Sequence, residues 1–468
     1  MVDRVVGVAG DVLVVLLLVL GVLAVLRVAW LAVRAGRRRQ LVVQALTNLT
    51  GHQKLDADAA GLTQTIRDAL LGELRSVHDR ARFLLRRAKI EPGEGELAPP
   101  RSEIETSLRE LSASVTAVAS GRIQPVARLL SDLVLRPAGT RIQGSLLRYG
   151  ERNRLGAGFE VVDLRGELRP ATFSLWAQDN SLTETSVLET RAEALAHVST
   201  RALAIELLRL DLLRRQRRRA WRGARDTGVV SRFVGLIYQA SALSFPDYRS
   251  QLYALSRDAL KDAASQLPDD YHPLKDLGDT LSRWQRVDPK RAERLLNAAL
   301  NAYDRAEEII DRTGADEAAR RSVRIGRALA RFKADVEVDL ARREARGVLE
   351  ELGTWDLAAE EDEFLLYNAA CLLALELAQP GCTETERLKT CARHLLGYAL
   401  LRDLSPDRTV FDTAEGDTDL DGLRKLGVDT VEIVRRYKDH QRALLRESGA
   451  MDDPKRLRAI VTEPNEIG

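Results

Sequence analysis

An uncharged apolar run near the start of the chain constrains its architecture more than any other feature. Residues 12 to 26 read VLVVLLLVLGVLAVL, and the apolar stretch extends through residue 33 if Arg27 lies near its edge. The resulting 22 residues, at about 1.5 Å per residue in a helix, span a hydrocarbon core of roughly 30 Å. The sequence therefore predicts a single amino-terminal transmembrane helix within residues 5–35.

Basic residues gather at one end of this run and predict its orientation. Four arginines follow it closely, namely Arg34, Arg37, Arg38 and Arg39. Cytoplasmic flanks of membrane helices carry an excess of Lys and Arg. We therefore expect a single-pass protein of a bacterial plasma (inner) membrane whose carboxy-terminal body is cytosolic. A cleaved signal peptide is the alternative, but it needs its positive charges before the apolar run and a small-residue cleavage site after it.

The composition of the chain describes a globular protein of more than one domain. Its 468 residues suffice for two or three domains, and 45% hydrophobic with 30% charged residues excludes wholesale disorder. A formal net charge of +2 offers no overall attraction to nucleic acid. Three cysteines, Cys371, Cys382 and Cys391, lie in one short window, which argues against a secreted disulfide framework and favours a reducing compartment.

An α/β pattern follows the apolar run. LVVQAL, residues 41–46, is a β-branched run of strand length that ends in the turn formers of TNLTG. Apolar residues then recur every four positions and predict one face of a helix: Leu62, Ile66, Leu70 and Leu74. A Pro/Gly linker at residues 91–101 and two further helical patterns predict a helical insertion. Three strand candidates with turn-rich connections come next and predict an antiparallel meander: residues 140–148, 155–164 and 171–176.

These segments resemble the TolB-like amino-terminal domain family over roughly residues 40–205. The family pattern is a strand ending in Asn-x-Ser/Thr-Gly, a helix opening with Gly-Leu-Thr, a Gly-Ser hairpin and an edge strand. The positions that match it are Asn48, Thr50, Gly51, Gly61, Leu62, Thr63, Gly144, Ser145, Val161, Asp163 and Gly166. Ala45 and Leu46 stand where the family has an aromatic residue. The resemblance implies a non-catalytic α/β module that is often joined to helical repeats, and it assigns no active-site residue.

An arginine-rich connector is expected between the two halves of the chain, at residues 206–245. Its segment LLRRQRRRAWRGAR places seven arginines between Arg214 and Arg225. Such a run can bind anionic lipid or nucleic acid. It can equally be the solvated end of a helix, because arginine is the default cation of this chain. The sequence leaves these three interpretations open.

Residues 246–447 predict paired helices, and residues 448–468 a flexible tail. Leu274, Leu277, Gly278 and Leu281, followed by Ala292, Leu296 and Ala299, show the small-and-large spacing of a tetratricopeptide helix pair. Two further pairs follow the same pattern, at Ile325, Gly326 and Leu329 with Ala345, Leu349 and Leu352, and at Leu366, Ala369, Ala370 and Leu373 with Ala392, Leu396 and Ala399. The expected fold is therefore an α+β module followed by an all-α, tetratricopeptide-like solenoid.

The sequence contains no convincing catalytic constellation. Phosphate-binding, dinucleotide-binding, zinc-protease and serine-hydrolase motifs are absent, and no cofactor is expected. DTDLDG, residues 417–422, places Asp417, Asp419 and Asp421 where a calcium loop has its first ligands, but Val428 stands where that loop needs Glu. We interpret the aspartates as helix caps and keep calcium as the weaker alternative.

These features predict a membrane-anchored adaptor, not an enzyme. The helical repeats would bind a protein partner, and the amino-terminal helix would anchor the protein in the lipid bilayer. Nucleic acid is not an expected partner. The sequence is also compatible with a homo-oligomer. One alternative is a regulatory or sensory subunit that controls an enzyme supplied in trans, with a ligand site in the α/β module. An enzyme of unrecognised type is the third hypothesis.

Overall fold

The computed structural model describes residues 40–50, 55–87, 139–149, 154–177, 185–217, 227–403 and 409–448, apart from six single positions at 165, 167, 356, 358, 359 and 361. The chain divides into two compact units. The first comprises residues up to Leu74 and from Ala98 to Arg214, and the second comprises Arg75–Leu97 and Arg215–Gly468. An α+β unit followed by an all-α unit confirms the predicted order of fold classes.

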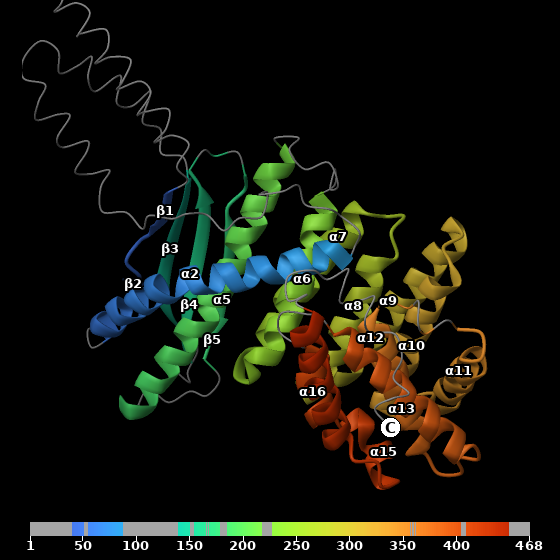
Figure 1. The fold of residues 1–468 in the computed structure, drawn as a ribbon. Coiled ribbons are helices and arrows are strands. Elements are labelled where there is room, and N and C mark those ends of the chain that lie inside the picture. Colours follow the sequence, from blue (N-terminus) through green and yellow to red (C-terminus); the bar gives the residue numbers. More distant parts are fainter. Residues whose placement is uncertain are drawn as a thin grey trace, which may run out of the picture. The chain divides into compact units, whose positions relative to one another are not determined.

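The first unit contains a mixed sheet and two long helices (Figure 1). Its elements are β1 (Gln40–Val43), β2 (Thr47–Asn48), α2 (Leu55–Arg87), β3 (Gly139–Tyr149), β4 (Arg154–Asp163), β5 (Ala171–Trp176) and α5 (Thr185–Arg217). Helix α2 gives its residues 55–74 to this unit and its later turns to the second. The strands lie in the order β1-β3-β4-β5, with β2 also paired to β3.

Strands β3, β4 and β5 form the predicted antiparallel meander. Thr140 pairs with Asp163 at one end of the β3–β4 ladder, and Phe159 pairs with Phe173 between β4 and β5. Alternate residues of β5 are buried and exposed, as expected for a strand that covers a core with one face. The predicted strand boundaries agree with the structure to within one residue at most ends.

Only the first half of the run LVVQAL is a strand, because β1 ends at Val43 and a second short strand, β2, begins after the run at Thr47. β1 and β2 both run parallel to β3, and the intervening Gln44 still donates its backbone N–H to Ile142. The turn after β2 is closed by Asn48, whose side-chain oxygen accepts from the backbone N–H of Thr50 at 3.0 Å. Thr63 of α2 accepts from the backbone N–H of Leu46, also at 3.0 Å. Asn48 therefore closes the turn, and Thr63 ties the segment between the strands to α2.

One face of the sheet holds the core of this unit. Side chains of Ile142, Leu146, Phe159 and Leu175 are buried on it. Helix α2 buries the predicted stripe of Leu62, Ile66, Leu70 and Leu74, and α5 adds a longer series that includes Leu195, Leu203 and Leu210. Fully burying one such side chain stabilises the fold by about 1.5–3 kcal/mol.

Arg214, the first residue of the predicted basic run, lies in an ion pair at the end of α5. Its guanidinium donates to Asp163 at 2.7 Å and to Thr140 at 2.8 Å, and only 10% of the Arg214 side chain and 1% of the Asp163 side chain are exposed. Arg214 is therefore a structural residue and not part of a solvated or ligand-binding run. Residues 218–225 of that run lie outside the described residues.

The second unit is built from helices. They are α6 (Thr227–Ser244), η1 (Pro246–Tyr248), α7 (Arg249–Gln266), α8 (His272–Gln285), η2 (Pro289–Arg291), α9 (Ala292–Thr313), α10 (Glu317–Ala334), α11 (Val338–Glu351), α12 (Glu363–Leu377), α13 (Thr385–Arg402), α14 (Thr409–Gly416), η3 (Thr418–Leu420), α15 (Asp421–Lys425) and α16 (Thr430–Ser448). The three helix pairs expected from the sequence correspond to α8–α9, α10–α11 and α12–α13. Each helix from α6 to α13 packs against the next one along the chain.

Alternate helices of this unit also touch. The first members of four successive pairs, α6, α8, α10 and α12, form a row in which each contacts the next. The segment with η3 and α15 then packs against α12. The row creates a shared surface that no single helix pair could offer.

Helix α6 belongs to this body, although the sequence placed its residues in the connector 206–245. Phe233, Val234 and Ile237 are buried in it, and α6 packs extensively against α7. Its apolar residues surround the helix instead of forming one stripe, so it shows little of the amphipathic periodicity by which the later pairs were recognised. Residues 227–244 therefore belong to the helical unit, although the predicted connector, 206–245, included them.

The small residues of the predicted repeats accommodate one aromatic ring. A Cβ built on Gly278 of α8 would lie 2.6 Å from the ring of Tyr303, and one on Gly326 of α10 would lie 2.8 Å from the same ring. Tyr303 itself belongs to α9 and is 1% exposed. The two glycines therefore let three helices close around a single tyrosine.

The predicted membrane anchor, including Arg34, Arg37, Arg38 and Arg39, lies outside the described residues, as do the linker at 91–101 and the tail after residue 448. Among the helices that are described, none combines the length and the apolar character needed to cross a bilayer.

Candidate functional site

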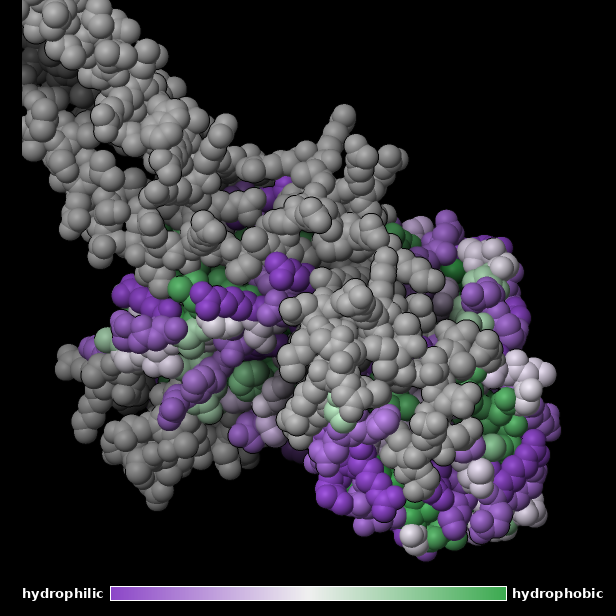
Figure 2. Space-filling view, viewed as in Figure 1, coloured by the Kyte–Doolittle hydropathy of each residue, from purple (hydrophilic) through white to green (hydrophobic). Residues whose placement is uncertain are grey.

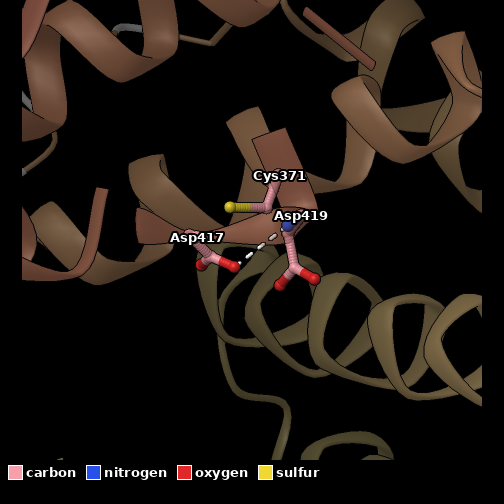
Figure 3. A group of neighbouring side chains, drawn as sticks. All are labelled: Cys371, Asp417 and Asp419. Carbon is pink, nitrogen blue, oxygen red and sulfur yellow. Dashed lines mark hydrogen bonds between the residues drawn. The ribbon is translucent and has the colours of Figure 1, made fainter. Parts of the chain in front are cut away.

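The aspartates of DTDLDG lie where α8, α10 and α12 meet η3. Asp417 caps η3, because its side chain accepts from the backbone N–H of Asp419 at 3.0 Å, the bond dashed in Figure 3. Its other carboxylate oxygen accepts from the Tyr367 hydroxyl at 2.7 Å. Asp417 is therefore a helix cap, as the sequence indicated.

Asp417, Asp419 and Cys371 form a group whose possible ligand atoms lie within 4.8 Å of one another. Lys333 contacts Asp419 at 2.7 Å, and Arg286 donates to the same carboxylate. Despite burial, these two cations hold the pKa of Asp419 below its ordinary value, whereas burial raises the pKa of the Cys371 thiol well above its own. A thiol ligand must be deprotonated. Protein cations thus already occupy the place that a metal ion would take.

Asp421 and Gly422 have separate structural roles in this motif. Asp421 makes an ion pair of 2.6 Å with Arg424, and no side-chain cap bond begins α15, so the capping interpretation is wrong for this aspartate. A Cβ on Gly422 would collide with the backbone carbonyl of Ala374 in α12. The glycine that resembled a calcium-loop position is required instead by this close helix contact.

A cavity of about 350 Å³ opens along the row of first helices, and we call it the α6–α12 cavity. The residues that line it from these helices and the loops before them are Arg232, Phe233, Leu236, Gln239, Ala240, Leu243, Tyr271, His272, Lys275, Asp276, Asp279, Arg283, Asp316, Ala318, Ala319, Ser322, Glu360, Asp362, Phe364, Leu365 and Asn368. Arg80 and Leu84, from the turns of α2 assigned to this unit, complete its wall. Its size falls in the lower part of the range of ligand pockets, roughly 300–1,000 Å³.

Two ion pairs form the floor of the cavity on α8. Arg232 of α6 contacts Asp276 at 2.6 Å, which ties α6 to α8. Lys275 contacts Asp279 at 2.8 Å, and the other oxygen of Asp279 accepts from the Tyr303 hydroxyl at 2.7 Å. These four side chains balance one another in two pairs, and Arg283, one turn farther along α8, adds a cation to the same wall.

Burial and neighbouring charges shift the pKa of three groups in or beside the cavity. Burial disfavours the charged form of Lys275, but Asp279, Asp276 and Asp362 together hold its pKa above the ordinary value. Burial raises the pKa of Tyr271 to about 12, so its phenol stays neutral at physiological pH. Bonds from His272 outweigh burial and hold the pKa of Asp270 below its usual range.

Carboxylates line the edge of the cavity at the beginnings of α10 and α12. Asp316 caps α10 by accepting from the backbone N–H of Ala319 at 2.9 Å. Asp362 caps α12 in the same way through Leu365, and Glu360 accepts from the backbone N–H of Asp362 at 3.0 Å. Neither Asp316 nor Glu360 forms an ion pair within the described residues.

Gln239 of α6 is an unsatisfied group in the cavity wall. Its side chain lines the cavity, the residue is 8% exposed, and the amide Nε2 lacks a hydrogen-bond partner within the described structure. Leaving a buried donor unsatisfied costs about 1–3 kcal/mol. The Nε2 atom itself is not accessible from the cavity, so this donor does not mark a ligand position.

The first unit has a second depression, on the sheet face opposite its core. It measures about 570 Å³ and is lined mainly by polar residues, among them Gln143, Ser145, Glu160, Thr172 and Ser174. It is broad and open, and the side chains that line it provide hydrogen bonds but little apolar enclosure.

Sequence reasoning did not identify the α6–α12 cavity, although a signal for it was present. Lys275, Asp279 and Arg283 recur at intervals of four and form a charged stripe beside the apolar stripe of α8. Such a stripe usually marks a solvated face. Only the packing of α6 and α10 against α8, and of α12 against α10, turns it into a cavity wall.

The surface of the helical unit in the view of Figure 2 is mostly hydrophilic, with small hydrophobic areas between. The large hydrophobic side chains that are exposed among the described residues are Leu49, Val336, Leu426 and Val431.

Comparisons of the chain with models of protein families, with curated proteins and with solved structures found no match. The geometry alone therefore supports the assignment of function.

Proposed function

We propose that this protein is a membrane-anchored adaptor that binds a partner protein through the α6–α12 cavity. In this proposal the helical unit is a tetratricopeptide-like solenoid, and the first unit is a TolB-like module near the cytosolic face of the membrane. Small residues at Gly278 and Gly326, with helices packed in sequential pairs, support the repeat assignment.

One observation carries the binding proposal. The cavity is lined by the first helices of four successive pairs, so that it extends along the row instead of lying inside one pair. Surfaces of this kind present side chains at regular intervals to an extended segment of another protein. The balanced ion pairs of its floor also favour binding over acid–base chemistry.

A crosslinking experiment in cells tests the proposal. Arg283, Ser322 and Asn368 line the cavity from α8, α10 and α12 and make no bond in the described structure on which the fold would depend. Replacing all three with Ala in the full chain should abolish partner capture from membranes, measured by mass spectrometry of the crosslinked material. The matched control replaces Arg305, Asn297 and Asn301, which are exposed on α9, with Ala.

The control variant should capture the same partners as the wild-type chain. If the cavity variant also retained every partner, the adaptor proposal would fail for this surface, and the binding site would have to be sought in the first unit.

A regulatory or sensory subunit is the second candidate, and the polar depression of the first unit favours it. Its hydroxyl, amide and carboxylate groups could hold a small polar ligand over β3, β4 and β5. Replacing Ser145 and Thr172 with Val would remove two of its hydrogen-bonding side chains. Loss of a metabolite-induced shift in melting temperature in that variant would support the regulatory candidate.

A further inference from the structure

We propose that the segment formed by η3 and α15, residues 418–425, is a clasp that locks the row of first helices at the ends of α8 and α10. The inference goes beyond the adaptor function and does not depend on it. Such a clasp lets the carboxy-terminal part of the helical unit govern when the ends of two much earlier helices open. Asp419, the middle residue of η3, carries the argument.

The carboxylate of Asp419 joins the ends of two helices. Lys333, in the last turn of α10, contacts one of its oxygens at 2.7 Å. Arg286, the residue that follows α8, donates to the other oxygen and also to the hydroxyl of Thr418 at 3.2 Å. Only 4% of the Asp419 side chain is exposed, so little water competes for these contacts. Without the carboxylate the two cations would repel one another, because like charges in a buried place are poorly screened.

The clasp is fixed more firmly to a third helix, α12. Asp417 accepts from the Tyr367 hydroxyl of α12 at 2.7 Å, and Gly422 lies directly against a backbone carbonyl of the same helix. Both η3 and α15 pack against α12. The connection to α8, by contrast, is made by the Arg286 side chain, which is 39% exposed. We therefore expect the clasp to open on the side of α8 and α10 and to stay attached to α12.

This connection reaches farther along the chain than stacked helix pairs normally do. In such arrays each pair contacts only its neighbours. Arg286 and Asp419 are 133 positions apart in the sequence, and η3 follows the pair α12–α13, which comes two pairs after α8–α9. The clasp thus makes the opening of α8 depend on residues near the carboxyl end of the helical unit.

Hydrogen–deuterium exchange of the full chain in mild detergent, followed by mass spectrometry, tests the proposal. Asp419→Asn keeps the size of the side chain and removes its charge. We expect the last turns of α8 and α10, residues 282–285 and 331–334, to exchange about tenfold faster, the effect of losing one hydrogen bond to a charged group. Helices α6 and α7 should exchange as in the wild-type chain.

Two further variants separate the contacts and do not remove the buried carboxylate. Arg286→Gln should act most on the end of α8, and Lys333→Met most on the end of α10. Both should also speed exchange in η3, because coupling between two sites is reciprocal. The ring of Tyr303 joins the middles of these helices, so the contrast is read at their last turns. Arg291→Gln, an exposed arginine that pairs with nearby Asp288, is the matched control and should change none of these segments.

Faster exchange in every helix of the unit, α6 and α7 included, would show that Asp419 supports the whole fold and not a local clasp. Faster exchange confined to η3 and α15 would show that the ends of α8 and α10 do not depend on the segment. Either result would overturn the proposal, as would equal responses of α8 to Arg286→Gln and to Arg291→Gln. No partner enters the measurement, so its failure leaves the adaptor proposal untouched.

Discussion

Arg214 and Asp163 show how much one pair of side chains contributes to the first unit. The pair joins the last turn of α5 to the end of β4, and Thr140 of β3 accepts from the same guanidinium. Both side chains are buried, so water cannot solvate the charge that remains if its partner is removed.

We therefore predict that Asp163→Ala lowers the free energy of unfolding by about 3–5 kcal/mol, the usual effect of leaving a buried charge without its partner. Urea unfolding followed by circular dichroism measures this change. The matched control is Asp269→Ala, which removes an exposed ion pair with Arg312. That change should cost about 0–1 kcal/mol, and equal losses for both variants would contradict the prediction.

Asp419 should make the helical unit sensitive to acid. Lys333 and Arg286 outweigh burial and depress its pKa below 3.8 in the folded state. The resulting stabilisation is fully present above the unfolded pKa and is lost as pH falls from about 4 through the folded pKa. We expect Asp419→Asn to be less stable than wild type at pH 7, with a smaller difference at pH 3. Urea midpoints at both pH values measure it, and a difference that did not shrink in acid would contradict this origin.

At the scale of helices and strands, packing against Tyr303 decides which glycines are replaceable. Gly326 faces the ring at close range, whereas Gly347 of α11 has no atom within 4 Å of a built Cβ. Both lie inside helices, where Ala is intrinsically favoured over Gly by about 1 kcal/mol. The two positions therefore separate packing from helix propensity.

Gly326→Ala should lower the free energy of unfolding by about 1–3 kcal/mol, because the new methyl group displaces the ring of Tyr303. Gly347→Ala should leave stability unchanged or raise it by up to about 1 kcal/mol. Thermal unfolding of the two variants side by side measures the contrast. Equal effects would mean that the ring adjusts without cost.

Sequence periodicity predicted the elements whose pattern is local. The meander, the leucine stripe of α2 and the pairs from α8 to α13 all follow from alternation or four-residue spacing. Helix α6 was missed as a body element because a helix that is buried all round lacks a polar face to mark it. The candidate site depends on long-range packing: Gln239, Asp279 and Glu360 are far apart in sequence, and only the tertiary structure brings them to one cavity.

At the scale of the whole molecule, the predicted amino-terminal anchor and its orientation would determine on which side of the membrane the proposed binding cavity lies. The arginines at positions 34, 37, 38 and 39 favour a cytosolic body. We expect a reporter fused after Gly468 to be active in the cytosol and the protein to stay with membranes through high-salt washing. A periplasmic reporter signal would refute both the orientation and a cytosolic partner.

Tyr303 has a consequence for how the helical body opens. In repeat proteins each pair usually gains stability from its own contacts and from those with its nearest neighbours, so end pairs can detach alone. One ring that contacts α8 and α10 from α9 joins two pairs into one cooperative element. Amide protons of these three helices should therefore exchange with solvent through a common opening, with similar protection, while those of α16 exchange sooner.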